Sequence, residues 1–252
     1  MLIDRVEFLG VAFDTLSEHQ VIDRLTRVTA ETPFGYIVTP NVDHVVRLSG
    51  EGTEPAIAAA YIDADLCVCD SRVLALLARF RGICLPVVAG SDLTAAMMEK
   101  ILNPGDRIAI VGGTVELVKR LSDRYPDFEF VHHCPPMGLR HDVAAQTAAA
   151  DFIAEAKCRF TILAVGSPQQ EMIAALVKGG TGFGLCVGAA IEFLTGDQVR
   201  APMMMRRTGL EWAHRLASDP RRLWRRYLVE GPRVFLLAWR WRAARAGDGR
   251  QA

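Results

Sequence analysis

The stretch ADLCVCDS at residues 64–71 sets a pattern that the rest of the chain repeats. Residues 66–69 are four apolar side chains in a row, typical of a short buried strand, and Asp70 stands where that strand should end. Apolar residues at helical spacing follow Ser71, so the stretch predicts a strand and then a helix. A carboxylate in this position can be a general base, and an Asp-Ser pair can equally cap the helix.

The same order of strand and helix recurs along the chain. Apolar runs that we interpret as strands occupy residues 6–11, 34–38, 66–69, 107–111, 128–131, 160–165 and 184–187. Helices are expected at 17–30, 42–48, 56–62, 71–81, 114–124 and 143–156, and again after 168 and 188. Most of the strand runs are continuously apolar, as in strands covered on both sides. The sequence therefore predicts an α/β fold with a Rossmann-like parallel sheet and helices on both faces.

Charge divides the chain into an acidic body and a basic tail. The formal net charge is zero, but residues 200–252 hold thirteen arginines, no lysine and four acidic residues, a net charge of +9. Tryptophans accompany the arginines on amphipathic segments, a pattern that suits an anionic lipid surface, a solvated basic face or nucleic acid. We place a domain boundary between an α/β body at 1–197 and a basic helical appendage at 198–252.

Cysteine usage and hydropathy indicate the cellular compartment. The six cysteines are scattered without a CxxC pair, and several lie in apolar runs. We expect buried free thiols in a reducing cytoplasm. No signal peptide and no apolar run of 18 residues is recognisable in the sequence.

Three of the predicted strands end in glycine-bearing turns that precede helices. These turns are Gly112-Gly113-Thr114, Gly166-Ser167-Pro168 and Gly188-Ala189-Ala190. Glycine lets the backbone approach a ligand, and N–H groups at a helix start attract phosphate, so three such turns favour a nucleotide or sugar nucleotide. Neither GxGxxG nor GxxxxGKS is present, which argues against a dinucleotide oxidoreductase or a P-loop protein.

Polar residues near these strand ends have both structural and binding interpretations. Glu171 suits the first turn of a helix electrostatically, whereas Gln169 and Gln170 can bind a ligand through their amides. Asn41, in Thr39-Pro40-Asn41, can cap a helix or face a site at a strand end.

Two sequences that could suggest a metal site have simpler interpretations. Asp63 and Asp65 precede their strand, so we expect them in a solvated turn at the sheet edge opposite Asp70. His132 and His133 are expected in a loop and point apart, and His133 is a candidate contact for a diphosphate.

The ordered set of motifs resembles the WecG/TagA/CpsF family, glycosyltransferase family 26, over roughly residues 5–235. The matching pieces are TPN at 39–41, residues 64–70, GSDL at 90–93, GGT at 112–114, GSPQQE at 166–171, VGAAIEFLTG at 187–196, and a run from Arg200-Ala201-Pro202 through TGLEW at 208–212 to Asp219-Pro220-Arg221-Arg222.

This resemblance implies inverting transfer of a sugar from a UDP-sugar to a polyprenyl-diphosphate-linked sugar, without a metal or other cofactor. The products are cell-surface polysaccharides such as exopolysaccharide, capsule or teichoic acid. The expected location is cytoplasmic, at the inner face of a bacterial plasma membrane with an anionic surface. A homo-oligomer is a possible further partner, and no nucleic acid is expected.

The resemblance also assigns roles to residues. It implies that Asp70 is the base and that Thr39, Asn41 and Gln170 belong to the catalytic pocket. Residues expected to bind substrate are Gly112, Gly113, Thr114, His133, Gly166, Pro168, Gln169, Glu171, Gly188 and Glu192, together with the appendage arginines Arg215, Arg222 and Arg225.

Some positions depart from the family pattern. Ser71, Val87 and Glu192 stand where members often have glycine, arginine and aspartate, and the loop from His133 to Pro136 replaces a His-Gly-Tyr type loop of the mannosaminyl transferases. A plain hexose such as glucose therefore becomes a credible donor sugar. The alternatives are an N-acetylmannosaminyltransferase and a non-catalytic nucleotide, nucleic-acid or membrane adaptor.

Overall fold

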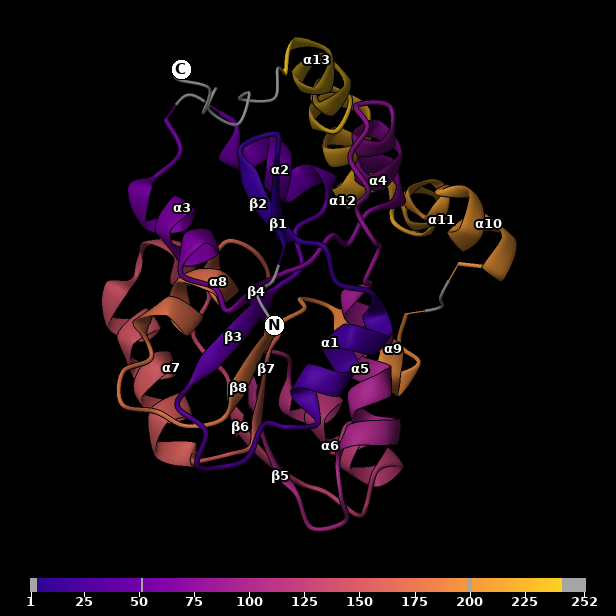
Figure 1. The fold of residues 1–252 in the computed structure, drawn as a ribbon. Helices are drawn as coiled ribbons and strands as arrows, with labels where there is room; N and C mark the ends of the chain where they lie inside the picture. The colour runs from indigo at the N-terminus through magenta and orange to yellow at the C-terminus, as the bar shows by residue number, and fades with distance from the viewer. Residues whose placement is uncertain (1–3, 51, 199–200, 242–252) are drawn as a thin grey trace.

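A parallel sheet of six strands forms the centre of the protein (Figure 1), seen in a computed structural model that describes residues 4–50, 52–198 and 201–241. The strands are β3 (Gly35–Val38), β4 (Leu66–Cys67), β5 (Arg107–Val111), β6 (Glu129–His133), β7 (Phe160–Leu163) and β8 (Phe183–Cys186), in the spatial order β4-β3-β8-β7-β5-β6. Every pairing within this sheet is parallel. The predicted α/β fold is confirmed.

Helices cover both faces of the sheet because successive strand residues point to opposite sides. Ile108 and Ile110 of β5 face one apolar cluster, whereas Val111 faces the other. One face carries α1 (Glu18–Leu25), α5 (Gly90–Ala96) with its π-helical continuation η1 (Met97–Ile101), α6 (Val115–Arg124) and α9 (Ala190–Thr195). The other carries α3 (Pro55–Ile62), α7 (Val143–Ala156) and α8 (Gln169–Leu176), with the 3-10 turn η2 (Leu139–His141) before α7.

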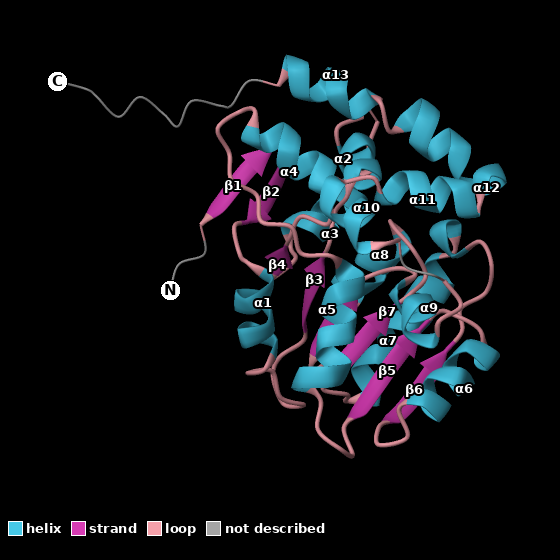
Figure 2. Cartoon of the chain, turned by 90° about the vertical axis from the view of Figure 1, so that its right-hand side faces the viewer, coloured by secondary structure: helices cyan, strands magenta, loops and turns pink. Residues whose placement is uncertain are grey.

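A further group of helices gathers at the carboxyl ends of the strands, towards which the arrows point in Figure 2. It consists of α2 (Val42–Leu48), α4 (Arg72–Arg79), α10 (Met203–Thr208), α11 (Glu211–Ser218), α12 (Pro220–Trp224), η3 (Arg225–Glu230) and α13 (Arg233–Arg240). Helix α13 packs on α2 and α4. Its buried Val234 and Ala238 belong to the same apolar cluster as Phe8 and Leu74 of the body.

The single strand predicted at residues 6–11 is wrong. The chain forms a hairpin of β1 (Arg5–Phe8) and β2 (Val11–Asp14), joined by Leu9 and Gly10, which both have positive φ. Leucine rarely adopts such a φ, so the turn is not evident from sequence. The buried Asp14 accepts hydrogen bonds from Arg5 Nε at 2.9 Å and from the backbone N–H of Cys67 at 2.7 Å. The hairpin thereby shields the edge strand β4.

Three other local predictions differ from the structure. The helix predicted at 17–30 ends at Leu25, and the helical segment at 90–101 was not predicted. His132 and His133, expected in a loop, are the last residues of β6. Pairing with β5 extends β6 to His133, opposite Val111.

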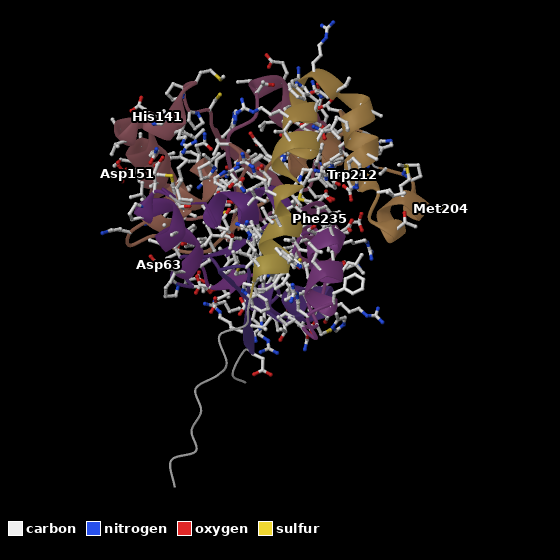
Figure 3. The ribbon with its side chains drawn as sticks, turned by 90° about the horizontal axis from the view of Figure 1, so that it is seen from above. Asp63, His141, Asp151, Met204, Trp212 and Phe235 are labelled. Atoms are coloured by element: carbon white, nitrogen blue, oxygen red, sulfur yellow. The ribbon has the colours of Figure 1, made fainter. Side chains whose placement is uncertain are left out.

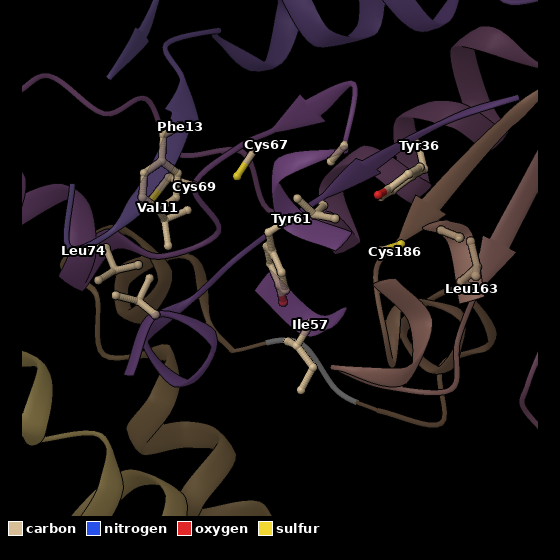
Figure 4. Close-up of a cluster of buried hydrophobic side chains, with 14 of the residues drawn as sticks. Val11, Phe13, Tyr36, Ile57, Tyr61, Cys67, Cys69, Leu74, Leu163 and Cys186 are labelled. Carbon is tan, nitrogen blue, oxygen red and sulfur yellow. The ribbon is translucent and has the colours of Figure 1, made fainter. Parts of the chain in front are cut away.

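The prediction of buried free thiols holds for four of the six cysteines. Cys67, Cys69 and Cys186 lie among apolar side chains (Figure 4), and Cys158 is also buried. Burial raises the pKa of Cys69 to about 12, so its thiol stays protonated at neutral pH. Cys84 and Cys134 are exposed.

Candidate functional site

A cavity of about 420 Å³ lies between the body and the helices of residues 209–235. The body contributes Asn41, Asp70 and Asp92 to its wall, and the tail contributes Glu211, Arg215 and Arg226. Figure 3 shows Trp212 and Phe235, which also line the cavity, on two different helices of the tail. Carboxylates and guanidinium groups from the two halves of the chain therefore share one enclosure.

Asp70 lines this cavity, and its neighbour Ser71 caps the helix that follows. Ser71 Oγ accepts the backbone N–H of Leu74 at 3.2 Å, as expected of an N-cap. The backbone N–H of Asp70 bonds to the carbonyl of Pro40, and its Oδ2 accepts the N–H of Gly90 at 3.2 Å. The two interpretations of the Asp-Ser pair thus fall on different residues: Ser71 is the cap, and the Asp70 carboxylate points to the cavity.

The electrostatic surroundings of Asp70 suit acid–base chemistry near neutral pH. Burial raises the pKa of Asp70 to about 7, although the Gly90 N–H and the Arg215 guanidinium oppose that rise. A general base works best when its pKa lies close to the operating pH.

Asn41 serves as both cap and cavity wall. Its Oδ1 accepts the backbone N–H of Asp43 at 3.0 Å, which starts α2, and also the Nη2 of Arg226 at 3.4 Å. Arg226 Nη2 lies 3.6 Å from Asp43 Oδ2, the same oxygen that Arg47 binds at 2.8 Å. In the described part of the chain, the buried Nε of Arg226 has no hydrogen-bond partner.

The appendage arginines are placed differently from one another. Arg215 lines the cavity, where it donates to Glu211 at 2.6 Å and lies over the ring of Phe193. Arg225 is exposed and pairs with Glu230 at 3.1 Å, outside the cavity wall. The side chain of Arg222 lies outside the described residues.

Sequence reasoning did not select Arg226, which stands beside Arg225 in the pair RR at 225–226. Of the pair, Arg226 lines the cavity, whereas Arg225 does not. The choice depends on how η3 packs against α2, a contact without a local sequence signal.

The glycine turns occupy the same edge of the sheet as Asp70 but lie outside the cavity wall. They follow β5, β7 and β8, which are adjacent strands. Gly112 has φ +99°, and a Cβ there would lie 2.7 Å from the side chain of Val165. Gly113, Gly166 and Gly188 also have positive φ. Two neighbouring regions therefore share this edge, a line of glycine turns and the cavity beside Asp70.

Three residues that were expected in the pocket are instead buried at this edge of the sheet, namely Thr39, Gln170 and Glu171. Gln170 is 2% exposed, accepts the N–H of Gly188 at 2.9 Å and donates to Glu171 Oε1 at 2.9 Å. Glu171 is fully buried, and burial raises its pKa. Thr39 Oγ1 donates to the carbonyl of Cys186 at 3.1 Å. Gln170 and Thr39 thus hold the turn after β8 in place, and Pro168 and Gln169 stand at the start of α8 beside it.

A buried polar network joins the turn after β7 to α2. Ser167 Oγ accepts Nη1 of Arg47 at 3.0 Å and lies 3.1 Å from the hydroxyl of Tyr61. The same hydroxyl lies 3.2 Å from Nδ1 of His44. Burial lowers the pKa of His44 to about 3, so the imidazole is neutral at physiological pH. Through Arg47 and Asp43 the network reaches Arg226 of the appendage.

The remaining predicted site residues make local contacts. His133 stacks on Phe152, whereas Nε2 of its neighbour His132 lies 2.9 Å from the carbonyl of Gly112. Thr114 caps α6. Glu192 is hydrogen-bonded by the side chain of Gln198.

The Asp-Ala-Asp sequence has a structural role at the opposite edge of the sheet. Asp65 Oδ2 accepts the backbone N–H of Tyr36 at 3.0 Å, and Asp63 is exposed at the end of α3. Across residues 4–50, 52–198 and 201–241, no group of three or more histidine, cysteine, aspartate or glutamate side chains is arranged to hold a metal ion.

A match with a known family extends over both halves of the site. A family model described as "Glycosyl transferase WecG/TagA/CpsF family" matches residues 6–248. The match includes Asp70 and the glycine turns of the body as well as Arg215 and Arg226 of the appendage.

Proposed function

The chain belongs to the WecG/TagA/CpsF family of glycosyltransferases, and from this premise we propose its reaction. It transfers a hexose or N-acetylhexosamine from a UDP-sugar to a polyprenyl-diphosphate-linked sugar in cell-surface polysaccharide synthesis. The observation that carries the proposal is the Asp70 carboxylate, with its pKa near 7, in a cavity that Arg215 and Arg226 complete.

In this reaction Asp70 removes the proton from the acceptor hydroxyl. The acceptor oxygen attacks the anomeric carbon from the face opposite UDP, the bond from that carbon to the UDP oxygen breaks, and the configuration inverts. The proton remains on Asp70, and UDP leaves with the electron pair. A general base of this kind contributes about 10²–10⁴-fold to the rate.

The donor diphosphate is assigned to the line of turns at Gly112, Gly166 and Gly188. Their positive φ angles open the backbone towards a ligand, and α6, α8 and α9 begin just after them. The cavity arginines add positive charge where negative charge develops on the leaving group. We propose that these groups neutralise the diphosphate without a metal ion.

The acceptor is assigned to the cavity, whose wall leads onto the apolar surface of the tail. Leu228 and Phe235 line the cavity and are also 56% and 57% exposed. A sugar diphosphate inside the cavity would thus continue into a lipid chain along these side chains. No helix among the described residues is long and apolar enough to cross a membrane. We propose peripheral binding of the appendage, residues 198–252, to an anionic membrane on the cytoplasmic side.

A donor screen tests this function. The full chain is incubated with a polyprenyl-diphosphate-linked sugar and with UDP-glucose, UDP-N-acetylglucosamine or UDP-N-acetylmannosamine, with and without EDTA, and UDP release and glycolipid are measured. We expect one donor to support turnover that EDTA leaves unchanged. Turnover with UDP-N-acetylmannosamine alone would select the mannosaminyl alternative, and loss of turnover in EDTA would refute the metal-independent mechanism.

A further inference from the structure

Helix α4 of the body has an outward face of arginine and large apolar side chains. Arg72, Leu76, Arg79 and Phe80 recur at helical spacing and are exposed, with Leu76 at 54% and Phe80 at 77%. The opposite face, with Leu74 and Ala78, is buried in the core. Burial of one face fixes the direction of the other, so these exposed apolar side chains are held towards solvent.

Helix α13 of the appendage has the same kind of outward face. Phe235, Leu236 and Trp239 are 57%, 47% and 75% exposed, whereas Val234 and Ala238 are buried. The two helices pack together at the top of the molecule in the view of Figure 1.

A direct hydrogen bond joins the exposed ends of the two helices. Nη2 of Arg81, just beyond α4, donates to the carbonyl oxygens of Ala238 and Trp239, at 3.0 Å for Trp239. Phe80 is the chain neighbour of Arg81, and Trp239 supplies one of the accepting carbonyls, so the most exposed aromatic residue of each helix stands next to this contact in the chain. The apolar side chains of α4 therefore extend the surface that α13 presents.

The charge of this combined surface has one sign. Residues 72–81 and 233–241 contain five arginines and no acidic residue. Aromatic and aliphatic side chains beside arginine suit the boundary between anionic headgroups and acyl chains. A second copy of the chain would bring the same positive surface and repel it.

We propose that α4 and α13 form one membrane-contact face, so that the catalytic body itself docks on anionic lipid through Leu76 and Phe80. The inference rests on the peripheral membrane binding proposed above for the appendage, and it adds a second anchoring helix beside Asp70 and Ser71. Such a two-helix face would fix the orientation of the cavity relative to the bilayer.

The test is flotation of the full-length chain with vesicles of phosphatidylglycerol and phosphatidylcholine, and with phosphatidylcholine alone. The double variant Leu76→Gln/Phe80→Gln is compared with Ile62→Gln/Val115→Gln, which changes two similarly exposed residues on α3 and α6. We expect the α4 variant to bind anionic vesicles roughly tenfold more weakly or worse, and the control to match the wild type. Circular dichroism melts confirm that both variants fold.

The outcomes distinguish membrane binding by the appendage from membrane contact by α4. If the wild type fails to float with anionic vesicles, membrane binding by the appendage is wrong. If the wild type floats and the α4 variant floats equally well, only the inference about α4 is overturned. If the α4 variant changes the oligomeric state in size-exclusion chromatography with light scattering, and not flotation, the face binds a second copy instead, which also overturns it.

Discussion

Replacing Asp70 with asparagine separates catalysis from folding. The asparagine side chain would keep the shape of the carboxylate and an oxygen that accepts the Gly90 N–H, and Ser71 would still cap α4. It cannot remove a proton from the acceptor. We expect turnover to fall about 10²–10⁴-fold, while the wild-type rate rises with pH to a plateau above the Asp70 pKa of about 7.

The same substitution should stabilise the protein at alkaline pH. The Asp70 pKa rises from 3.8 to about 7 on folding, so the folded state holds the proton more tightly and the free energy of unfolding declines as pH rises through this window. Three pH units correspond to at most about 4 kcal/mol. Since the Asp70 side chain is partly open to the cavity, we expect about 2 kcal/mol. Asparagine does not titrate, so the free energy of unfolding of the variant lacks this decline.

Two measurements on the same preparations check this reasoning. Urea unfolding at pH 5 and pH 8 should show the stability difference, variant minus wild type, increasing with pH. Turnover is measured in parallel with the donor found in the screen. An Asp70→Asn protein that retains near wild-type turnover, or that is less stable than wild type at pH 8, would show that Asp70 has a structural role.

Two further predictions concern the appendage and the hairpin. Arg226→Gln should raise the KM for the diphosphate-linked acceptor roughly tenfold or more, because a partly buried guanidinium is lost from the cavity, whereas Arg225→Gln should change KM far less; steady-state kinetics of both variants decide. Asp14→Ala should lower the free energy of unfolding by about 2–4 kcal/mol, because the buried N–H of Cys67 loses its acceptor; a urea titration that shows no change would contradict this.

The sheet was predictable because its signal is local and repeated. Runs such as residues 108–111 and 162–165 are apolar throughout and are followed directly by glycine, which specifies buried parallel strands. The residues after each strand necessarily meet at one edge, so Asn41, Asp70 and the glycine turns could be assigned to one region before their contacts were known.

The cavity itself was less predictable because its contacts connect distant parts of the chain. Gln170 carries an amide that could bind a ligand, yet this amide is hydrogen-bonded to the backbone of Gly188 and to the side chain of Glu171. Arg226 differs from Arg225 only in helical phase. The hairpin was not predicted because its turn contains Leu9 at positive φ, which leucine rarely adopts. In each case the outcome depends on a residue distant in the sequence or on the backbone conformation, and a local sequence pattern predicts neither.

The edge-to-face contact between Phe8 and Trp241, with ring centroids 5.2 Å apart, bears on how the protein is made. It joins the first strand to the last described residue, and the cavity likewise needs both Asp70 and Arg226. During synthesis the hairpin leaves the ribosome before α13, so Phe8 lacks its Trp241 partner until residues 233–241 have been made. A nascent chain that stops short of these residues therefore has neither the Phe8–Trp241 contact nor both walls of the cavity.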